Sequence, residues 1–249
     1  MKKLLLIIFV CSLTSLCSAG IDCKGDAGND DMIVYSSDLG ISAYPFTFCV
    51  RWDITAGTQN IVASLHDSSA ADVYYYLEVA NDHATIVARN TTLRANEGTT
   101  DIGSGIHSVC AVWAAADDRK VYVNGGANEA QGAVVSVTFN TATDQFSVCG
   151  SDDSTPTSNA QKLYDISVWD VALTEAEAAQ YHNGNLRRIA LQTQSANDIV
   201  SSPLDDYTDG TTGMGGNSFR DESGSGNTGT LVDSDGDSIA LAETEMSYQ

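Results

Sequence analysis

The chain has 249 residues, with 33 Asp and Glu against 12 Lys and Arg, which gives a formal net charge of −21. Nucleic acid and anionic lipid headgroups repel so acidic a chain, so neither is expected as a partner. The acidic residues have two interpretations: a solvated surface, or clustered carboxylates that hold a hard cation such as calcium. The solvated surface must account for most of the charge.

The first 19 residues predict a secretory signal peptide. Lys2 and Lys3 form a positive start, residues 4–13 are apolar, and Cys17-Ser18-Ala19 is a small-residue cleavage site. The apolar run is too short for a membrane span, and no later stretch is apolar enough to be one. We therefore expect a secreted, extracellular protein without membrane insertion.

The body of the chain alternates short strand patterns with polar turns. Apolar and polar residues alternate with the two-residue period of half-buried strands, as in "FTFCVRWDI". The expected strands are residues 32–37, 46–54, 59–65, 73–79, 85–89, 107–113, 119–126, 134–139, 145–150 and 162–170. Many short strands with polar turns predict an all-β protein, an antiparallel β-sandwich.

One segment after the last clear strand predicts a short helix. In "LTEAEAAQYHNGN", Thr174 is the expected N-cap and Glu177 completes a capping box, while Asn183-Gly184 ends the helix.

Beyond residue 191 the composition changes to one rich in Ser, Gly, Asp and Thr. Such a composition is also typical of disordered tails. The segment "FRDESGSGNTGTL" nevertheless has the pattern of a turn and a short strand. We expect residues 192–249 to form a partly ordered acidic appendage on a domain of residues 20–191.

Four segments, in this order and spacing, carry a family resemblance: "FTFCVRW", "HSVCAVWAAADDRKVYVNG", "FSVCGSDD" and "LYDISVWDVALTEAEAAQYHNG". The set resembles the LamG/pentraxin-type domain of the concanavalin A-like lectin and glucanase superfamily, over about residues 21 to 186. The resemblance implies a two-sheet antiparallel jelly-roll sandwich with one short helix after the last core strand.

Four cysteines follow the signal peptide, namely Cys23, Cys49, Cys110 and Cys149. An even number in an exported chain favours disulfides, and the absence of CxxC pairs makes zinc improbable. The resemblance to pentraxins implies a bridge between Cys49 and Cys110. It would close a loop of about 60 residues and contribute ~4 kcal/mol. No spacing argument pairs Cys23 with Cys149.

No catalytic constellation is evident in the sequence. A glycosidase of this superfamily would present two carboxylates from one strand, but Glu78 has no partner carboxylate two or four residues on within its strand. A serine nucleophile elbow is also missing. We therefore expect no enzymatic activity, with a divergent glycoside hydrolase as the less favoured alternative.

The resemblance implies instead a binding site with calcium as its cofactor. By position, the pentraxin metal loops correspond to Asp72 and to "CGSDDS", which supplies Asp152 and Asp153. Oxygen ligands of this kind suit calcium, although solvated loop aspartates explain the same residues. In the run Tyr74-Tyr75-Tyr76, alternation separates Tyr75 from its neighbours, and we predict Tyr75, with Asp72, as a ligand-binding residue.

The expected function is thus a secreted, non-catalytic binding module that recognises carbohydrate or another extracellular ligand, with calcium assistance. The alternative is a structural or adhesive protein of a cell surface or virion, whose partner is another surface protein. The fold alone does not choose between them.

Overall fold

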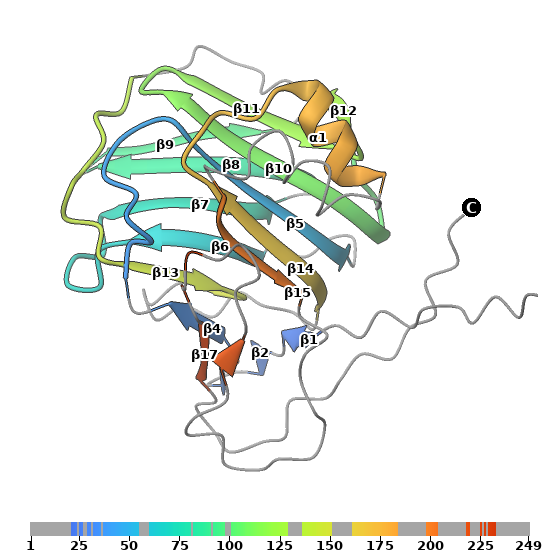
Figure 1. Cartoon of the computed structure of the whole chain (residues 1–249), viewed down its shortest axis with the longest axis horizontal. Coiled ribbons are helices and arrows are strands. Elements are labelled where there is room, and N and C mark those ends of the chain that lie inside the picture. The colour runs from blue at the N-terminus through green and yellow to red at the C-terminus, as the bar shows by residue number, and fades with distance from the viewer. Residues whose placement is uncertain are drawn as a thin grey trace, which may run out of the picture.

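The computed structural model places two antiparallel sheets as the layers of a sandwich (Figure 1). It describes residues 21–23, 25–26, 29–30, 32–35, 37–54, 60–80, 82–90, 92–97, 101–128, 136–150, 161–183, 198–203, 218–219, 225, 227 and 229–232. The signal peptide predicted at residues 1–19 lies outside them. Among the described residues, no helix is long and apolar enough to cross a membrane.

A seven-stranded sheet forms one layer. Its order is β1 (Ile21–Cys23), β14 (Gln161–Trp169), β5 (Phe46–Ile54), β10 (Gly105–Ala115), β11 (Asp118–Val123) and β12 (Gly126–Asn128), and β15 (Asp198–Pro203) also pairs with β14. The order follows the chain only at β10–β12, so the other neighbours come from distant parts of the sequence.

An eight-stranded sheet forms the other layer. Its order is β16 (Ser218–Phe219), β17 (Gly229–Val232), β4 (Met32–Tyr35), β13 (Gln145–Val148), β6 (Asn60–His66), β7 (Val73–Ala80), β8 (His83–Asn90) and β9 (Thr92–Glu97). A separate two-stranded ribbon joins β2 (Gly25–Asp26) to β3 (Asn29–Asp30).

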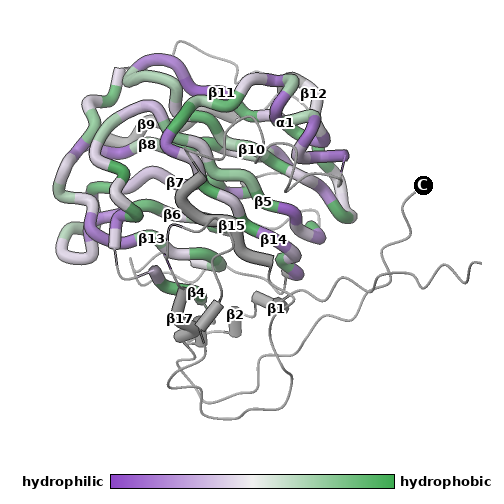
Figure 2. Tube along the Cα trace, viewed as in Figure 1, coloured by the Kyte–Doolittle hydropathy of each residue, from purple (hydrophilic) through white to green (hydrophobic). Residues whose placement is uncertain are grey.

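The main hydrophobic core lies between the two sheets. From β5, the alternate residues Phe46, Phe48, Val50 and Trp52 enter this core, where they are at most 1% exposed. Figure 2 shows the hydrophobic stretches along the central strands and the hydrophilic ones at turns and on the helix. The period-two pattern in the sequence therefore describes the inner face correctly.

The outer face of the seven-stranded sheet is also covered. The helix α1 (Glu175–His182) and the segment before it pack over β5, β10 and β14, and a second cluster forms there around Cys49, Cys110, Trp169, Leu173 and Tyr181. This cover explains why both faces of β5 are buried near its middle.

The strand expected at residues 134–139 is wrong for its described part. Residues 136–139 form no strand, and Val137 and Phe139 pack against the core without a ladder. Their backbone groups bond elsewhere: the Val137 N–H donates to the Ala116 carbonyl, and the Tyr44 hydroxyl donates to the Val137 carbonyl. The apolar pattern correctly predicted that these side chains pack against the core. A segment that crosses between the two sheets can bury them as well as a strand can.

The segment after residue 191 contributes strands to both sheets. β15 pairs antiparallel with β14, while β17 pairs antiparallel with β4 and carries β16 on its other side. Each sheet thus has edge strands that come from the last quarter of the sequence.

Candidate functional site

Tyr75, which the sequence suggested as a ligand-binding residue, lies in the hydrophobic core. It is 0% exposed, stacks on Phe139 with ring centroids 5.0 Å apart, and its hydroxyl accepts the Asn140 N–H at 2.9 Å. A buried ring cannot stack on a sugar, so the choice of Tyr75 is wrong. Alternation along β7 puts Tyr74 and Tyr76 on the opposite, outer face of the eight-stranded sheet.

Around these two tyrosines, the outer face of the sheet is polar and aromatic. Opposite Tyr74 lie His66 on β6 and Arg89 on β8, and opposite Tyr76 lie Ser64 and Val87. We call the following outer-face residues the tyrosine face: Ser64, His66, Tyr74, Tyr76, Glu78, Thr85, Val87, Arg89, Gln145 and Ser147. Only Tyr76, Arg89 and Gln145 among them are partly exposed, and the other seven are at most 9% exposed.

The two tyrosine rings stack on each other. Their centroids are 4.5 Å apart with an interplanar angle of 21°, and Tyr76 remains half-buried. Tyr74 also contacts a cation: the Arg89 guanidinium carbon lies 5.6 Å from the Tyr74 ring centroid, within cation–π range. Burial raises the pKa of the Tyr76 hydroxyl well above its ordinary value, and the Glu78 charge and a Tyr74 hydrogen bond raise it further. Tyr76 is therefore a neutral hydroxyl on a rigidly held ring.

A chain of hydrogen bonds fixes the imidazole of His66 beneath this pair. Its Nε2 lies 3.1 Å from the Gln145 Oε1, and its Nδ1 lies 3.3 Å from the Ser64 hydroxyl. Because an amide oxygen only accepts, His66 Nε2 donates to Gln145. His66 is 5% exposed, so it supports the face more than it forms its surface.

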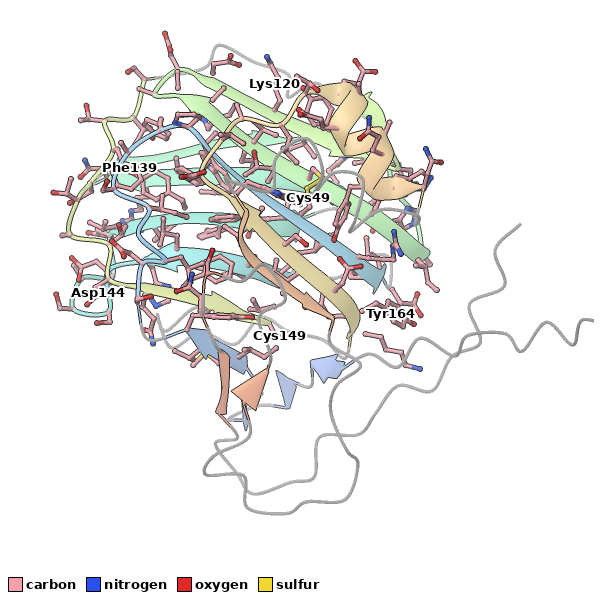
Figure 3. All side chains as sticks on the ribbon, viewed as in Figure 1. Cys49, Lys120, Phe139, Asp144, Cys149 and Tyr164 are labelled. Atoms are coloured by element: carbon pink, nitrogen blue, oxygen red, sulfur yellow. A yellow bond between two sulfur atoms is a disulfide. The ribbon has the colours of Figure 1, made fainter. Side chains whose placement is uncertain are left out.

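Two carboxylates border the tyrosine face: Asp144, which directly precedes β13, and Asp72, in the loop between β6 and β7. Asp144, at the edge of the molecule in Figure 3, accepts the Ser68 N–H at 2.7 Å and the Ser68 hydroxyl at 2.8 Å. The Ser68 N–H holds the pKa of Asp144 below its ordinary value, so this carboxylate stays charged. Asp72 forms an ion pair with Arg89.

The calcium ligands expected from the sequence are only partly described. Asp152 and Asp153 lie outside the described residues, and Asp72 faces the Arg89 guanidinium, a position that does not suit a cation. Within the described ranges, no group of three or more His, Cys, Asp and Glu could hold a metal ion. Calcium binding therefore stays a prediction.

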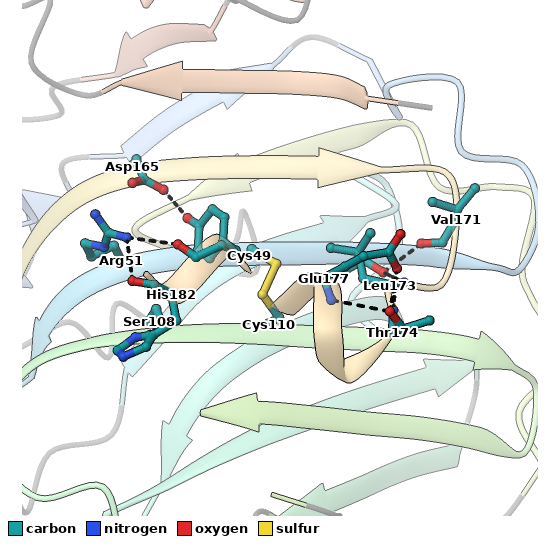
Figure 4. The surroundings of a disulfide bond; sticks show 12 residues. Cys49, Arg51, Ser108, Cys110, Asp165, Val171, Leu173, Thr174, Glu177 and His182 are labelled. Atoms are coloured by element: carbon teal, nitrogen blue, oxygen red, sulfur yellow. Dashed lines mark hydrogen bonds between the residues drawn. A yellow bond between two sulfur atoms is a disulfide. The ribbon is translucent and has the colours of Figure 1, made fainter. Parts of the chain in front are cut away.

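The disulfide between Cys49 and Cys110 is confirmed. The two residues lie directly opposite each other on β5 and β10, 4.0 Å apart at Cα, and α1 covers them from outside (Figure 4). The bond lies on the outer face of β5, because the inner face is filled with aromatic rings. Cys149, just after β13, is also disulfide-bonded, whereas the side chain of Cys23 is not described.

The helix α1 has the capping box that the sequence predicts. The Thr174 hydroxyl accepts the Glu177 N–H, and the Glu177 carboxylate accepts the Thr174 N–H at 2.8 Å. At the other end, Arg51 from β5 donates to the Tyr181 and His182 carbonyls at 3.1 and 3.3 Å (Figure 4). A cation therefore satisfies the last carbonyls of the helix and complements its dipole.

The residues of the tyrosine face were missed by sequence reasoning, although their signal was present. Strict alternation in "VYYYLEV" put Tyr74, Tyr76 and Glu78 together, and only the choice between the two faces was wrong. His66 and Arg89 carried no signal of their own, because sequence alone does not give the register that brings β6 and β8 beside β7.

Comparison with protein-family models finds no match, and neither does comparison with curated proteins. Solved structures do match. A native heptameric SAP-like pentraxin from Limulus polyphemus matches with a TM-score of 0.53 and 17% identity, over 69% of this chain and 84% of the pentraxin. A putative carbohydrate-binding protein from Bacteroides ovatus matches with a TM-score of 0.58 and 16% identity, over 90% of this chain and 62% of that protein.

A third structure is the CBM40 domain of the Ruminococcus gnavus IT-sialidase bound to α2,3-sialyllactose. It matches at a TM-score of 0.50 and 15% identity, over 68% of this chain and 98% of the domain. Likenesses at such low identity establish architecture, and they agree with the jelly roll that the sequence implies. The protein has the concanavalin A-like jelly-roll fold that pentraxins share with carbohydrate-binding domains.

Proposed function

We propose that this protein is a secreted, non-catalytic module that binds carbohydrate at the tyrosine face. The fold supports a lectin-type role, since its structural neighbours include carbohydrate-binding proteins. The Cys49–Cys110 disulfide supports an oxidising, extracellular location.

The observation that carries the proposal is the Tyr74–Tyr76 stack on an otherwise polar outer face. A sugar ring has an apolar face, which packs against an aromatic ring, and hydroxyl groups, which need hydrogen-bond partners around its edge. Tyr76 offers the ring, while Gln145 and Arg89 are partly accessible polar groups on neighbouring strands. An aromatic ring with hydrogen-bonding groups beside it is the smallest set of groups that a sugar-binding site needs.

A glycan array with the secreted form, residues 20–249, tests the proposal. We expect Tyr76→Ala to weaken binding about tenfold or more, equivalent to about 1.4 kcal/mol, and Tyr76→Phe to retain most of it. Lys120→Ala is the matched control, because Lys120 lies on β11 of the other sheet and is similarly accessible. Equal thermal stability of the variants would show that the folds are intact.

The same array, run with calcium and with a chelator, tests calcium assistance. We propose Asp152 and Asp153 as its ligands, so an Asp152→Ala/Asp153→Ala variant should lose any calcium-dependent signal. Binding to no glycan under either condition would overturn the proposal and favour the structural or adhesive role. Glycan binding that Tyr76→Ala leaves unchanged would support carbohydrate binding but would place its site elsewhere than on the tyrosine face.

A further inference from the structure

The C-terminal end of α1 is fastened to the seven-stranded sheet by polar contacts from three neighbouring strands. From β5, Arg51 donates to the backbone carbonyls of Tyr181 and His182. From β10, the Ser108 hydroxyl lies 2.9 Å from the His182 Nδ1. From β14, the Asp165 carboxylate accepts the Tyr181 hydroxyl. We call these contacts the helix clasp, and Figure 4 shows them at one end of the helix.

The helix itself is short and buries few side chains. It has eight residues, of which Ala178 and Tyr181 are buried. A helix of fewer than about 12 residues is marginal by itself in water, so docking on the sheet, more than helix propensity, keeps α1 folded. Weakening the helix clasp therefore favours release of the last turn.

The docked helix covers the disulfide between Cys49 and Cys110. The two cysteines are 0% and 2% exposed, and they share an apolar cluster with Ala178 and Tyr181 of the helix. Thiol–disulfide exchange needs direct attack on a sulfur atom, so its rate depends on access to the bond. Release of α1 would provide that access.

The helix clasp includes a group that titrates in mild acid. Burial lowers the pKa of His182, and the charges of Arg51 and His107 lower it further. His182 is therefore harder to protonate while α1 is docked than after release, when the imidazole is hydrated. The other charged or titratable groups that the described residues bring to this end or carry on α1 are Asp53 on β5, Lys162 and Asp165 on β14, and Glu175, Glu177 and Tyr181 on the helix.

We propose that α1 is an acid-released cover, whose last turn leaves the sheet in mild acid and exposes the Cys49–Cys110 disulfide to dithiol reductants. A protonated His182 would stand beside Arg51, which donates to the carbonyl of the same residue, so release separates two like charges. A dithiol that reaches the bond would break it. Two protein thiols then form, and the dithiol becomes a disulfide.

Reduction by a water-soluble phosphine measures access to the bond. As the two thiols form, the phosphine becomes its oxide with oxygen from water, and iodoacetamide labelling with peptide mass spectrometry then counts the thiols of Cys49 and Cys110. Uptake of one proton on release shifts the equilibrium up to about tenfold per pH unit below about pH 6.5. We therefore expect reduction to be at least about threefold faster at about pH 5.5 than at about pH 7.5.

Two variants of the secreted form, residues 20–249, separate the role of His182 from the pH dependence of the reagent. His182→Gln keeps a neutral polar side chain beside Ser108, so its ratio of the two rates should be at least about threefold smaller than that of the unmodified protein. Gln180→Ala is the matched control. It changes a neutral side chain on the same helix and should keep the full ratio.

Hydrogen exchange of the unmodified protein distinguishes release of the helix from unfolding of the whole domain. The Ala178 and Asn183 amides donate to the Thr174 and Ala179 carbonyls, whereas the β10 amides belong to the centre of the sheet. After correction for the intrinsic effect of pH, we expect faster exchange in residues 175–183 in mild acid and continued protection in residues 108–113.

Three results would each overturn the proposal. The first is a rate ratio in the unmodified protein no larger than that of His182→Gln. The second is equal protection of α1 at both pH values, and the third is loss of protection in β10 together with α1. None of these measurements involves a glycan, so they do not depend on the proposed function.

Discussion

Two histidines near the C-terminal end of α1 have lowered pKa values. Burial lowers the pKa of His182, and the nearby charges of Arg51 and His107 lower it further. Burial also lowers the pKa of His107, although a hydrogen bond from Asn124 and the charge of Asp53 oppose the shift. Arg51, His107 and His182 would be three like charges at one end of the helix if both imidazoles were protonated.

These shifts predict a protein that loses stability in mild acid. Unfolded chains protonate histidine near pH 6.5, whereas the folded protein does so only at a lower pH. As pH falls below about 6.5, the unfolded state gains protons first, so the free energy of unfolding decreases until the folded pKa values are reached. The lowered pKa of Asp144 acts in the same direction at still lower pH, because its contribution is lost as that carboxylate is protonated.

Thermal unfolding between about pH 7.5 and about pH 5 measures this loss. A His107→Gln/His182→Gln variant should show a flatter dependence than the unmodified protein. A slope that is the same in the two proteins would contradict the assignment.

The tyrosine run shows what residue-level prediction could and could not reach. Alternation correctly separated Tyr75 from Tyr74 and Tyr76, because the geometry of a strand is local. Which side faces the other sheet depends on the partner layer, and β7 carries aromatic rings on both sides. Leu77 and Val79 share the side of Tyr75, whereas Glu78 shares the side of Tyr74 and Tyr76. This apolar asymmetry marked Tyr75 as the inner residue, and the prediction did not use it.

At the scale of elements, α1 was predicted almost to the residue, but its docking was not. The capping box is a local pattern and forms as expected at Thr174. Docking depends on the turn between β11 and β12, where Asn124 and Gly125 both have positive φ, as in the tight turns favoured by Asn-Gly. A Cβ on Gly125 would lie 2.7 Å from the Cα of Ala179 in α1. The helix therefore approaches this hairpin as closely as a residue without a side chain permits.

This close approach predicts a large effect of Gly125→Ala. Gly40 is the matched control, because its φ of +77° resembles the +72° of Gly125, while a Cβ on Gly40 would have no neighbour within 4 Å. Gly40→Ala should cost about 1 kcal/mol from the backbone alone. Gly125→Ala should cost about 1–3 kcal/mol more, because it also overpacks the interface with α1. Denaturant unfolding measures the stability lost by each variant. Equal losses would show that α1 shifts to accommodate the added methyl group without a cost in free energy.

At the scale of the whole molecule, the sequence predicted the sandwich from its strand patterns but not how the chain completes it. The long strands β5, β10 and β14 were found because one face of each is strongly apolar. β15 was hidden in a Ser, Gly and Asp-rich segment whose composition resembles a tail, whereas β17 falls in "FRDESGSGNTGTL", where the sequence indicated a turn and a short strand. Their place in the sheets is secured by backbone pairing with β14 and β4, which depends little on side-chain pattern.

This pairing predicts that the segment after residue 191 is needed for a stable, monodisperse protein. A chain ending at Leu191 would leave the edges of β14 and β4 without β15 and β17, and exposed edges promote association with other chains. We expect a lower melting temperature and larger particles in size-exclusion chromatography with light scattering. The matched control ends at Val232, which removes the terminal residues and keeps both strands. Equal melting temperatures and equal monodispersity of the two truncated proteins would contradict this prediction. The backbone pairing of β15 and β17 would then add no stability to that supplied by the core.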